Sequence, residues 1–127
     1  MFNHIDELKK LNLPIGEYAI FGSGPMAIRH IRDLQDIDIV VKQNLWNKLA
    51  IKYKDNIEQN PERIVVKNIE IFKDWLDLTD KIDEIINTAE EINGLSFVKL
   101  NYVIEWKEKM GREKDIKLIK EFQKNSL

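Results

Sequence analysis

The sequence contains no cysteine, and only two histidines and three prolines occur among its 127 residues. The lack of cysteine excludes disulfides and thiolate metal sites. Two histidines also argue against a histidine-rich zinc site. A metal ion bound to this chain would therefore have oxygen ligands, which favours Mg²⁺, Mn²⁺ or Ca²⁺.

Long hydrophobic runs are also absent. No run approaches the roughly 18 residues that a membrane-spanning helix requires, and the first residues lack the cationic and apolar regions of a signal peptide. The net charge of −2 gives no general attraction to nucleic acid or anionic lipid. With 43% hydrophobic and 33% charged residues, the composition is typical of a globular protein. We expect a cytoplasmic protein with no membrane partner and a single domain over residues 1–127.

Hydrophobic spacing predicts helices that are interspersed with short strands. Helices are expected over residues 3–11, 26–31, 43–54, 82–92, 101–110 and 113–124. Strands are expected over residues 17–21, 36–41, 63–66, 69–72 and 95–100. A hairpin turn is expected at Lys67-Asn68, and Asn93-Gly94 is expected to cap the helix before it. This order predicts an α/β (α+β) fold, with a small mixed sheet flanked by helices and a helical part over residues 79–127.

A glycine turn, Gly22-Ser23-Gly24, follows the first expected strand. Glycine lets the backbone approach an anion closely, and the start of the next helix offers unpaired N–H groups. Ser23 adds a hydroxyl donor, and Pro25 suits the first turn of a helix. These features predict a phosphate-binding turn. The alternative is a strand-to-helix corner that uses glycine only for its geometry.

The same stretch also fits the G-x-G-x-x-A dinucleotide fingerprint when it is extended to Ala27. That motif requires an acidic residue near the far end of the second strand, where it binds ribose. Here the second strand ends in Val40-Val41-Lys42, and its acidic residues lie at its start. A Rossmann-type dinucleotide binder is therefore the less favoured interpretation.

Acidic residues alternate with aliphatic ones in two of the expected strands. Asp36 and Asp38 are two positions apart, so both carboxylates point to one face, while Ile37 and Ile39 point into the core. Carboxylates this close raise each other's pKa unless a cation lies between them. Glu70 alternates with isoleucines in the same way, and if its strand pairs beside the first, three carboxylates gather for two metal ions. The alternatives are a solvated strand face for the aspartates, against which the valines that follow argue, and an exposed position for Glu70.

Together, Phe21-Gly22-Ser23 and Asp36-Ile37-Asp38-Ile39, separated by residues 24–35, resemble the pattern of the DNA polymerase β-type nucleotidyltransferase superfamily. The resemblance covers about residues 16–72 as motif, and Glu70 resembles the later strand acid of that superfamily. It is similar above all to compact prokaryotic nucleotidyltransferase-like proteins, including those related to AbiEii toxins and minimal nucleotidyltransferases.

The resemblance implies a nucleotidyltransferase fold and transfer of an NMP from an NTP to an acceptor hydroxyl, with release of pyrophosphate. It implies that the Gly22-Ser23-Gly24 turn grips the triphosphate. It also implies that Asp36 and Asp38 bind Mg²⁺ or Mn²⁺, and that Glu70 binds one metal ion and activates the acceptor. The superfamily more usually has Asp where this chain has Glu70. The chain also lacks a separate acceptor-binding domain, so the C-terminal helices or a partner chain would recognise the acceptor.

Several basic residues are further candidates for binding nucleotide phosphates. They are Arg29, Arg32, Lys107, Arg112 and Lys114. Arginine is a fork-shaped phosphate donor, and the segment over residues 106–115 resembles Trp-Lys…Gly-Arg…Lys-Asp segments of nucleotidyltransferase-like proteins. The alternatives are an ion pair of Arg32 with a nearby aspartate and, near the C-terminus, a solvated helical face. The three tryptophans are most simply core or subunit-contact residues.

The sequence does not select the acceptor, and a small molecule, an RNA or a protein would each fit. A homo-oligomer or a partner protein is compatible with the same residues. The alternative to an enzyme is a catalytically silent nucleotide- or partner-binding module, such as one component of a toxin–antitoxin pair. Mg²⁺- and NTP-dependent turnover would distinguish the enzyme from the module.

Overall fold

The structure, a computed structural model, describes residues 5–21, 36–75, 80–109, 116–117 and 120–121. The helices are α1 (Ile5–Lys10), α3 (Gln43–Lys52), α4 (Ile82–Asn87) and α5 (Leu100–Lys109), with a short 3-10 turn η1 (Lys54–Asn56). The strands are β1 (Tyr18–Phe21), β2 (Ile37–Val41), β3 (Ile57–Glu58), β4 (Arg63–Val66), β5 (Ile69–Phe72), β6 (Glu90–Ile92) and β7 (Leu95–Phe97).

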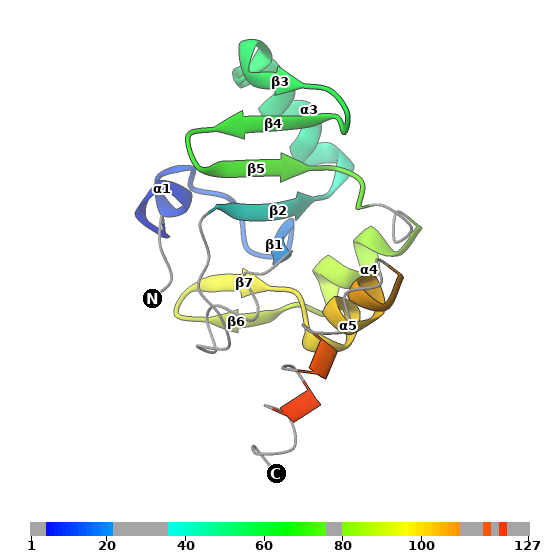
Figure 1. Cartoon of the computed structure of the whole chain (residues 1–127). Helices are drawn as coiled ribbons and strands as arrows, with labels where there is room; N and C mark the ends of the chain where they lie inside the picture. Colours follow the sequence, from blue (N-terminus) through cyan, green and yellow to red (C-terminus); the bar gives the residue numbers. More distant parts are fainter. Residues whose placement is uncertain (1–4, 22–35, 76–79, 110–115, 118–119, 122–127) are drawn as a thin grey trace.

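The seven described strands form one sheet in the order β3-β4-β5-β2-β1-β7-β6 (Figure 1). The central strand β2 runs antiparallel to β1 and parallel to β5. The strand β7 runs parallel to β1, while β4–β5 and β6–β7 are antiparallel pairs. The sheet is therefore mixed, and the predicted α+β fold class is confirmed. The central position of β2 also agrees with the run of valines that ends it.

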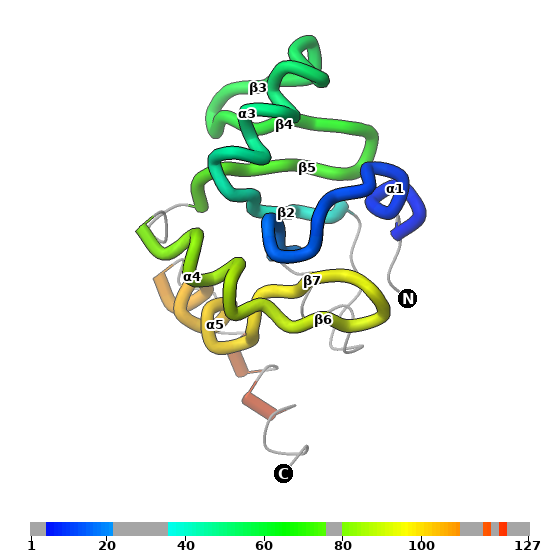
Figure 2. Tube along the Cα trace, turned by 180° about the vertical axis from the view of Figure 1, so that it is seen from behind, coloured from blue at the N-terminus to red at the C-terminus, as the bar shows by residue number. Residues whose placement is uncertain are grey.

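Alternation along the central strands buries one set of side chains on each face of the sheet. On one face, the side chains of Ile37 and Ile39 pack with those of α1 and α3 around Trp46, and we call this cluster the α3-side core. On the other face, the side chain of Val40 packs with those of α4 and α5 around Trp75 and Trp106, in the α5-side core. Figures 1 and 2 show α3 beside β4 and β5, and α4 and α5 near β6 and β7. The prediction of core positions for the tryptophans is confirmed.

The prediction of a helix over residues 82–92 is wrong beyond Asn87, where α4 ends. The residues that follow form the β6–β7 hairpin. Its turn is Asn93-Gly94, with φ angles of 53° and 79°. Positive φ at both turn residues is typical of a two-residue hairpin turn, so this dipeptide reverses the chain instead of capping a helix. The apolar stripe is divided accordingly, because Ile82 packs in the α5-side core and Ile92 against the α3-side core.

The remaining expected elements agree with the structure to within a few residues, including the β4–β5 hairpin around Lys67, which has a φ of 56°. The two-residue strand β3 was not predicted, and the strand expected over residues 95–100 ends at Phe97. The helix expected over residues 26–31 lies outside the described residues. Of the helix expected over residues 113–124, the residues 116–117 and 120–121 are described and are helical. No helix in the described part of the chain is both long and apolar enough to cross a membrane.

Candidate active site

The acidic residues Asp38 and Glu70 are register partners on the adjacent parallel strands β2 and β5. On its other side, Asp38 is opposite Phe21, the last residue of β1. Side chains of residues in register point to the same face of a sheet, so both carboxyl groups lie on the face of the α5-side core. The structure thus has the pairing of the two acidic strands on which the sequence-based prediction of a shared site depended, and the functional roles of these acids stay a prediction.

The pKa of Asp38 shows how close these carboxyl groups are. Burial, followed by the charge of Glu70, a hydrogen bond with Glu70 and the charge of Asp36, raises the pKa of Asp38 to about 7, although the charge of Arg63 acts in the opposite direction. Asp38 is partly buried, whereas Asp36 is exposed at the start of β2. Without a cation, Asp38 therefore holds its proton up to near neutral pH, and a nearby divalent cation would favour its carboxylate form.

Glu70 is held by Arg63 of the neighbouring strand β4. The Arg63 Nε atom donates a hydrogen bond to Glu70 Oε1 at 2.8 Å. Arg63 Nη1 donates to the backbone carbonyl oxygens of Pro61 at 2.9 Å and Gln59 at 3.2 Å. Arg63 Nη2 lies 3.6 Å from Oε1 of Glu58. The guanidinium group is thus fixed by the chain between β3 and β4 and presents one N–H to Glu70.

Arg63 was missed by the sequence analysis, although a signal for it was present. The two-residue turn at Lys67-Asn68 pairs Val66 with Ile69 and Val65 with Glu70. Because side chains alternate along a strand, Arg63 then lies on the same face as Glu70, one diagonal step away. An opposite charge at that position of a predicted hairpin indicates a cross-strand ion pair.

The carboxylate oxygens of this cluster are of the kind that binds Mg²⁺ or Mn²⁺. Among the residues that the structure describes, no group of three or more acidic or histidine side chains is arranged to hold a metal ion. Mg²⁺ is commonly held by one or two carboxylates together with waters and substrate phosphates. Asp38 and Glu70 provide such a pair, and Asp36 lies near enough for its charge to act on Asp38.

The other predicted site residues are mostly not described. Gly22, Ser23, Gly24, Arg29, Arg32, Arg112 and Lys114 lie outside the described residues. The strand β1 ends at Phe21, opposite Asp38, and the glycine turn follows Phe21 in the sequence.

Lys107 is the one predicted phosphate-binding cation that the described residues include. It is fully buried on α5, and its Nζ atom lies 4.5 Å from the centroid of the Trp106 ring. A lysine ammonium over an indole face is stabilised by a cation–π interaction. A solvated helical face is therefore wrong for Lys107, and its binding of nucleotide phosphates stays a prediction.

Comparison with known proteins gives one informative similarity. No family model matches the sequence, and no curated protein matches it. The chain is similar to a crystal structure from Thermotoga maritima described as a "putative nucleotidyltransferase", with a TM-score of 0.59 and 15% sequence identity. The similarity covers 98% of this chain and 96% of the other. At this identity it bears on the fold alone, and the chain therefore has a nucleotidyltransferase-like fold.

Proposed function

We propose that this chain is a metal-dependent nucleotidyltransferase that moves an NMP from an NTP to an acceptor hydroxyl. One observation carries the proposal: Asp38 and Glu70 are in register on adjacent parallel strands, with Asp36 near Asp38. The nucleotidyltransferase-like fold supports it, and so does the glycine turn that follows β1 in the sequence. Repulsion between neighbouring, partly buried carboxylates destabilises the fold, and such arrangements are found most often at functional sites.

The proposed roles follow from the position of each side chain. Asp38 and Glu70, together with Asp36, would hold Mg²⁺ or Mn²⁺, and such an ion stabilises the charge that develops on phosphoryl oxygens. Arg63 fixes the orientation of the Glu70 side chain from the neighbouring strand. The Gly22-Ser23-Gly24 turn would bind the triphosphate through its backbone N–H groups.

In the proposed reaction, the acceptor hydroxyl oxygen forms a bond to the α-phosphorus of the NTP. The bond from that phosphorus to the oxygen bridging the α- and β-phosphates breaks, and pyrophosphate leaves. The proton of the acceptor hydroxyl passes to the carboxylate of Glu70. Arg63 holds that carboxylate in place through a hydrogen bond to Oε1.

A labelling experiment tests this proposal. The purified protein is incubated with each α-labelled NTP, Mg²⁺ and cell extract, and the labelled molecules are separated. We expect one acceptor to become labelled by the wild type and by Glu91→Gln, an exposed acid on the edge strand β6 that serves as the matched control. Asp38→Asn and Glu70→Gln should leave that acceptor unlabelled. Equal labelling by all four proteins would refute the assignment of the site.

The ion pair of Arg63 with Glu70 favours a second candidate function, a catalytically silent nucleotide-binding module. In such a module the Glu70 carboxylate would remain neutralised by the guanidinium group, and nucleotide would bind without turnover. Calorimetry with Mg²⁺ and each NTP, followed by the labelling experiment, distinguishes the two functions. Saturable binding without label transfer to any acceptor would favour the module.

A further inference from the structure

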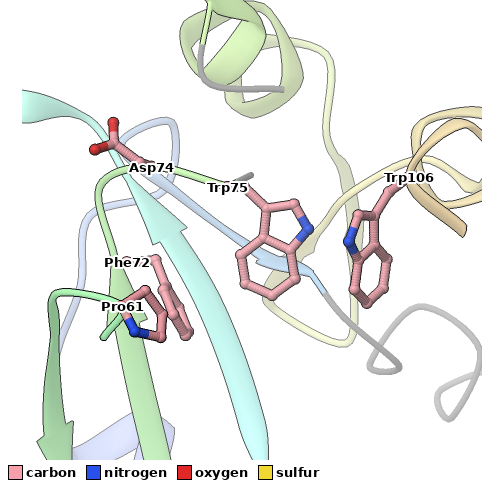
Figure 3. Close-up of a pocket in the computed structure, with 5 residues that line it drawn as sticks. All are labelled: Pro61, Phe72, Asp74, Trp75 and Trp106. Atoms are coloured by element: carbon pink, nitrogen blue, oxygen red, sulfur yellow. The ribbon is translucent and has the colours of Figure 1, made fainter. Parts of the chain in front are cut away.

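An apolar pocket lies on the same face of the sheet as the candidate active site (Figure 3). Its volume is about 160 Å³, and it is lined by Pro61, Phe72, Asp74, Trp75 and Trp106. Figure 3 shows the carboxylate of Asp74 directed away from the rings, so rings form the inner wall. A cavity of about 150 Å³ with apolar walls is enough to bind a benzene-sized molecule. The pocket therefore fits one flat ring system and is too small for a whole nucleotide.

The pocket is connected to Glu70 in two ways, through the strand β5 and through Arg63. Phe72 follows Glu70 by two residues on β5 and lies on the same face, which separates their Cα atoms by only about 6.6 Å at the usual rise of a strand. Pro61, which lies next to Phe72 in the wall of the pocket (Figure 3), accepts a hydrogen bond from Arg63 through its carbonyl oxygen. A single ligand can therefore reach from the pocket to Glu70 along β5.

The aromatic walls of the pocket are fixed by contacts among themselves. Trp75 stacks on Phe21 with ring centroids 4.7 Å apart and an interplanar angle of 15°. The rings of Phe72 and Trp106 meet Trp75 edge-on, at centroid distances of 4.9 and 5.2 Å. Aromatic rings in edge-to-face or offset-stacked pairs attract each other. These contacts hold the rings in place, so the wall of the pocket is preformed.

The indole of Trp75 adds a polar group to the wall of the pocket. The indole Nε1 of Trp75 is buried and has no hydrogen-bond partner among the described residues, and Trp75 is only 6% exposed. Figure 3 shows this nitrogen on the side of the ring that faces Trp106. Buried indole N–H groups usually find an acceptor. In the structure this nitrogen has almost no exposed surface, so a ligand acceptor would reach it only after a rotation of the Trp75 ring.

We propose that this pocket binds the nucleobase of the nucleotide, an inference that rests on the proposed function. Stacking on aromatic side chains is available to every base because each base has a flat π-face. The base would lie against Phe72 and Trp75, and the sugar and phosphates would extend along β5 toward Glu70. The ring walls, the volume and the position beside the acid pair point to this ligand.

Tryptophan fluorescence tests the pocket without metal and without turnover. Trp46 packs in the α3-side core, on the other face of the sheet, so Trp46→Phe leaves Trp75 and Trp106 as the reporters. Adenosine, guanosine, cytidine and uridine are each titrated into this variant, with excitation at the red edge of tryptophan absorption. We expect saturable quenching by at least one of these nucleosides.

Two variants of the pocket, each made in the Trp46→Phe background, sharpen the test. Phe72→Leu removes one ring but keeps an apolar side chain, and it should weaken nucleoside binding about ten-fold, in line with the usual value of one base–aromatic contact. Trp75→Phe keeps a ring but removes the unpartnered N–H donor, and it should weaken binding less. Thermal unfolding of each variant checks that it is folded, and quenching that is identical in all three proteins would overturn the proposal.

A second titration separates this proposal from the proposed function. Mg²⁺-tripolyphosphate, which has no base, is titrated by calorimetry into the wild type, Phe72→Leu and Asp38→Asn. Weakening by Asp38→Asn alone, with nucleoside binding weakened by Phe72→Leu alone, supports the pocket as a base site. Nucleoside binding without any tripolyphosphate binding retains the pocket and refutes nucleotidyl transfer. Absence of nucleoside binding, or quenching by N-acetyltyrosinamide in its place, overturns the base assignment.

Discussion

At the scale of single residues, Asp38 makes the stability of the metal-free protein depend on pH. Its folded-state pKa of about 7 lies above its ordinary value of 3.8. The folded protein therefore holds a proton that the unfolded chain has already released between these two pH values. The free energy of unfolding should fall as the pH rises through this window.

The variant Asp38→Asn should remove this dependence, because an amide does not titrate. We expect it to be more stable than the wild type by about 1–3 kcal/mol at pH 8, and to differ little from it at pH 4. Urea unfolding at both pH values, in the presence of a chelator, measures the difference. The same stability change at both pH values would contradict the raised pKa.

The ion pair of Arg63 with Glu70 should be stronger than an ordinary surface pair. Both side chains are partly buried, with exposed fractions of 20% and 27%, and the guanidinium group is held by two carbonyl oxygens. In a double-mutant cycle of Arg63→Gln and Glu70→Gln, we expect a coupling energy of about 1–2 kcal/mol.

The matched control for this cycle is the pair of Lys73 with Glu62, whose Nζ and Oε1 atoms lie 3.2 Å apart and whose side chains are 29% and 41% exposed. Its coupling energy should be below about 0.5 kcal/mol. Chemical unfolding at one pH measures both cycles. Equal coupling in the two pairs would mean that Arg63 does not position Glu70.

At the scale of elements, the β6–β7 hairpin depends on the backbone of its turn. Gly94 has a φ of 79°, and no atom lies within 4 Å of the position that a Cβ would occupy. Gly94→Ala should therefore cost about 1–2 kcal/mol through backbone strain alone. Asn93→Gly should be nearly neutral, because glycine also adopts the positive φ required there. Thermal unfolding compares the two variants, and equal stability of Gly94→Ala and the wild type would argue against this turn.

The spacing of hydrophobic residues predicted the elements that are long or strongly patterned. It failed where the chain crosses over to pack on the opposite face of the sheet. Ile82, Ile85 and Ile86 follow the helical stripe that the structure confirms. Ile92 continues that spacing, but it belongs to a strand that packs on the opposite face. The Asn93-Gly94 dipeptide fits both a helix cap and a hairpin turn, and local sequence does not decide between them. The strand β3 has two residues, too few for any period.

In the candidate site, too, the features set by local sequence could be predicted, and those set by contacts between distant segments could not. The alternation of acids with isoleucines predicted which side chains share a face, because that depends only on the strand period. That β5 lies beside β2 was a condition of the prediction, since strand order in a sheet is set by packing of the whole chain. Prediction of the Arg63–Glu70 pair requires the register of the β4–β5 hairpin, and the two-residue turn of that hairpin sets this register. The aromatic pocket could not be predicted from the sequence, because Trp75 and Trp106 come together only through packing of the α5-side core.

At the scale of the whole molecule, the acid pair lies on two inner strands of the sheet, β2 and β5. The strand β2 has neighbours on both sides and buried side chains on both faces. Carboxyl groups fixed on such strands keep their separation, whereas carboxyl groups on a loop could move apart. The acid pair lies on β2 and β5, Phe21 at the end of β1 is opposite Asp38, and the aromatic pocket is on the same face of β5.

The measurement that tests this arrangement most directly is pyrophosphate release from each NTP by four proteins. They are the wild type, Asp38→Asn, Glu70→Gln and the double variant. Because the two carboxylates act as one unit, we expect each single change to slow release by about 10³-fold and the double variant to be no slower than the worse single one. Wild-type release by either single variant, or a double variant slowed by the product of the two effects, would contradict a shared site.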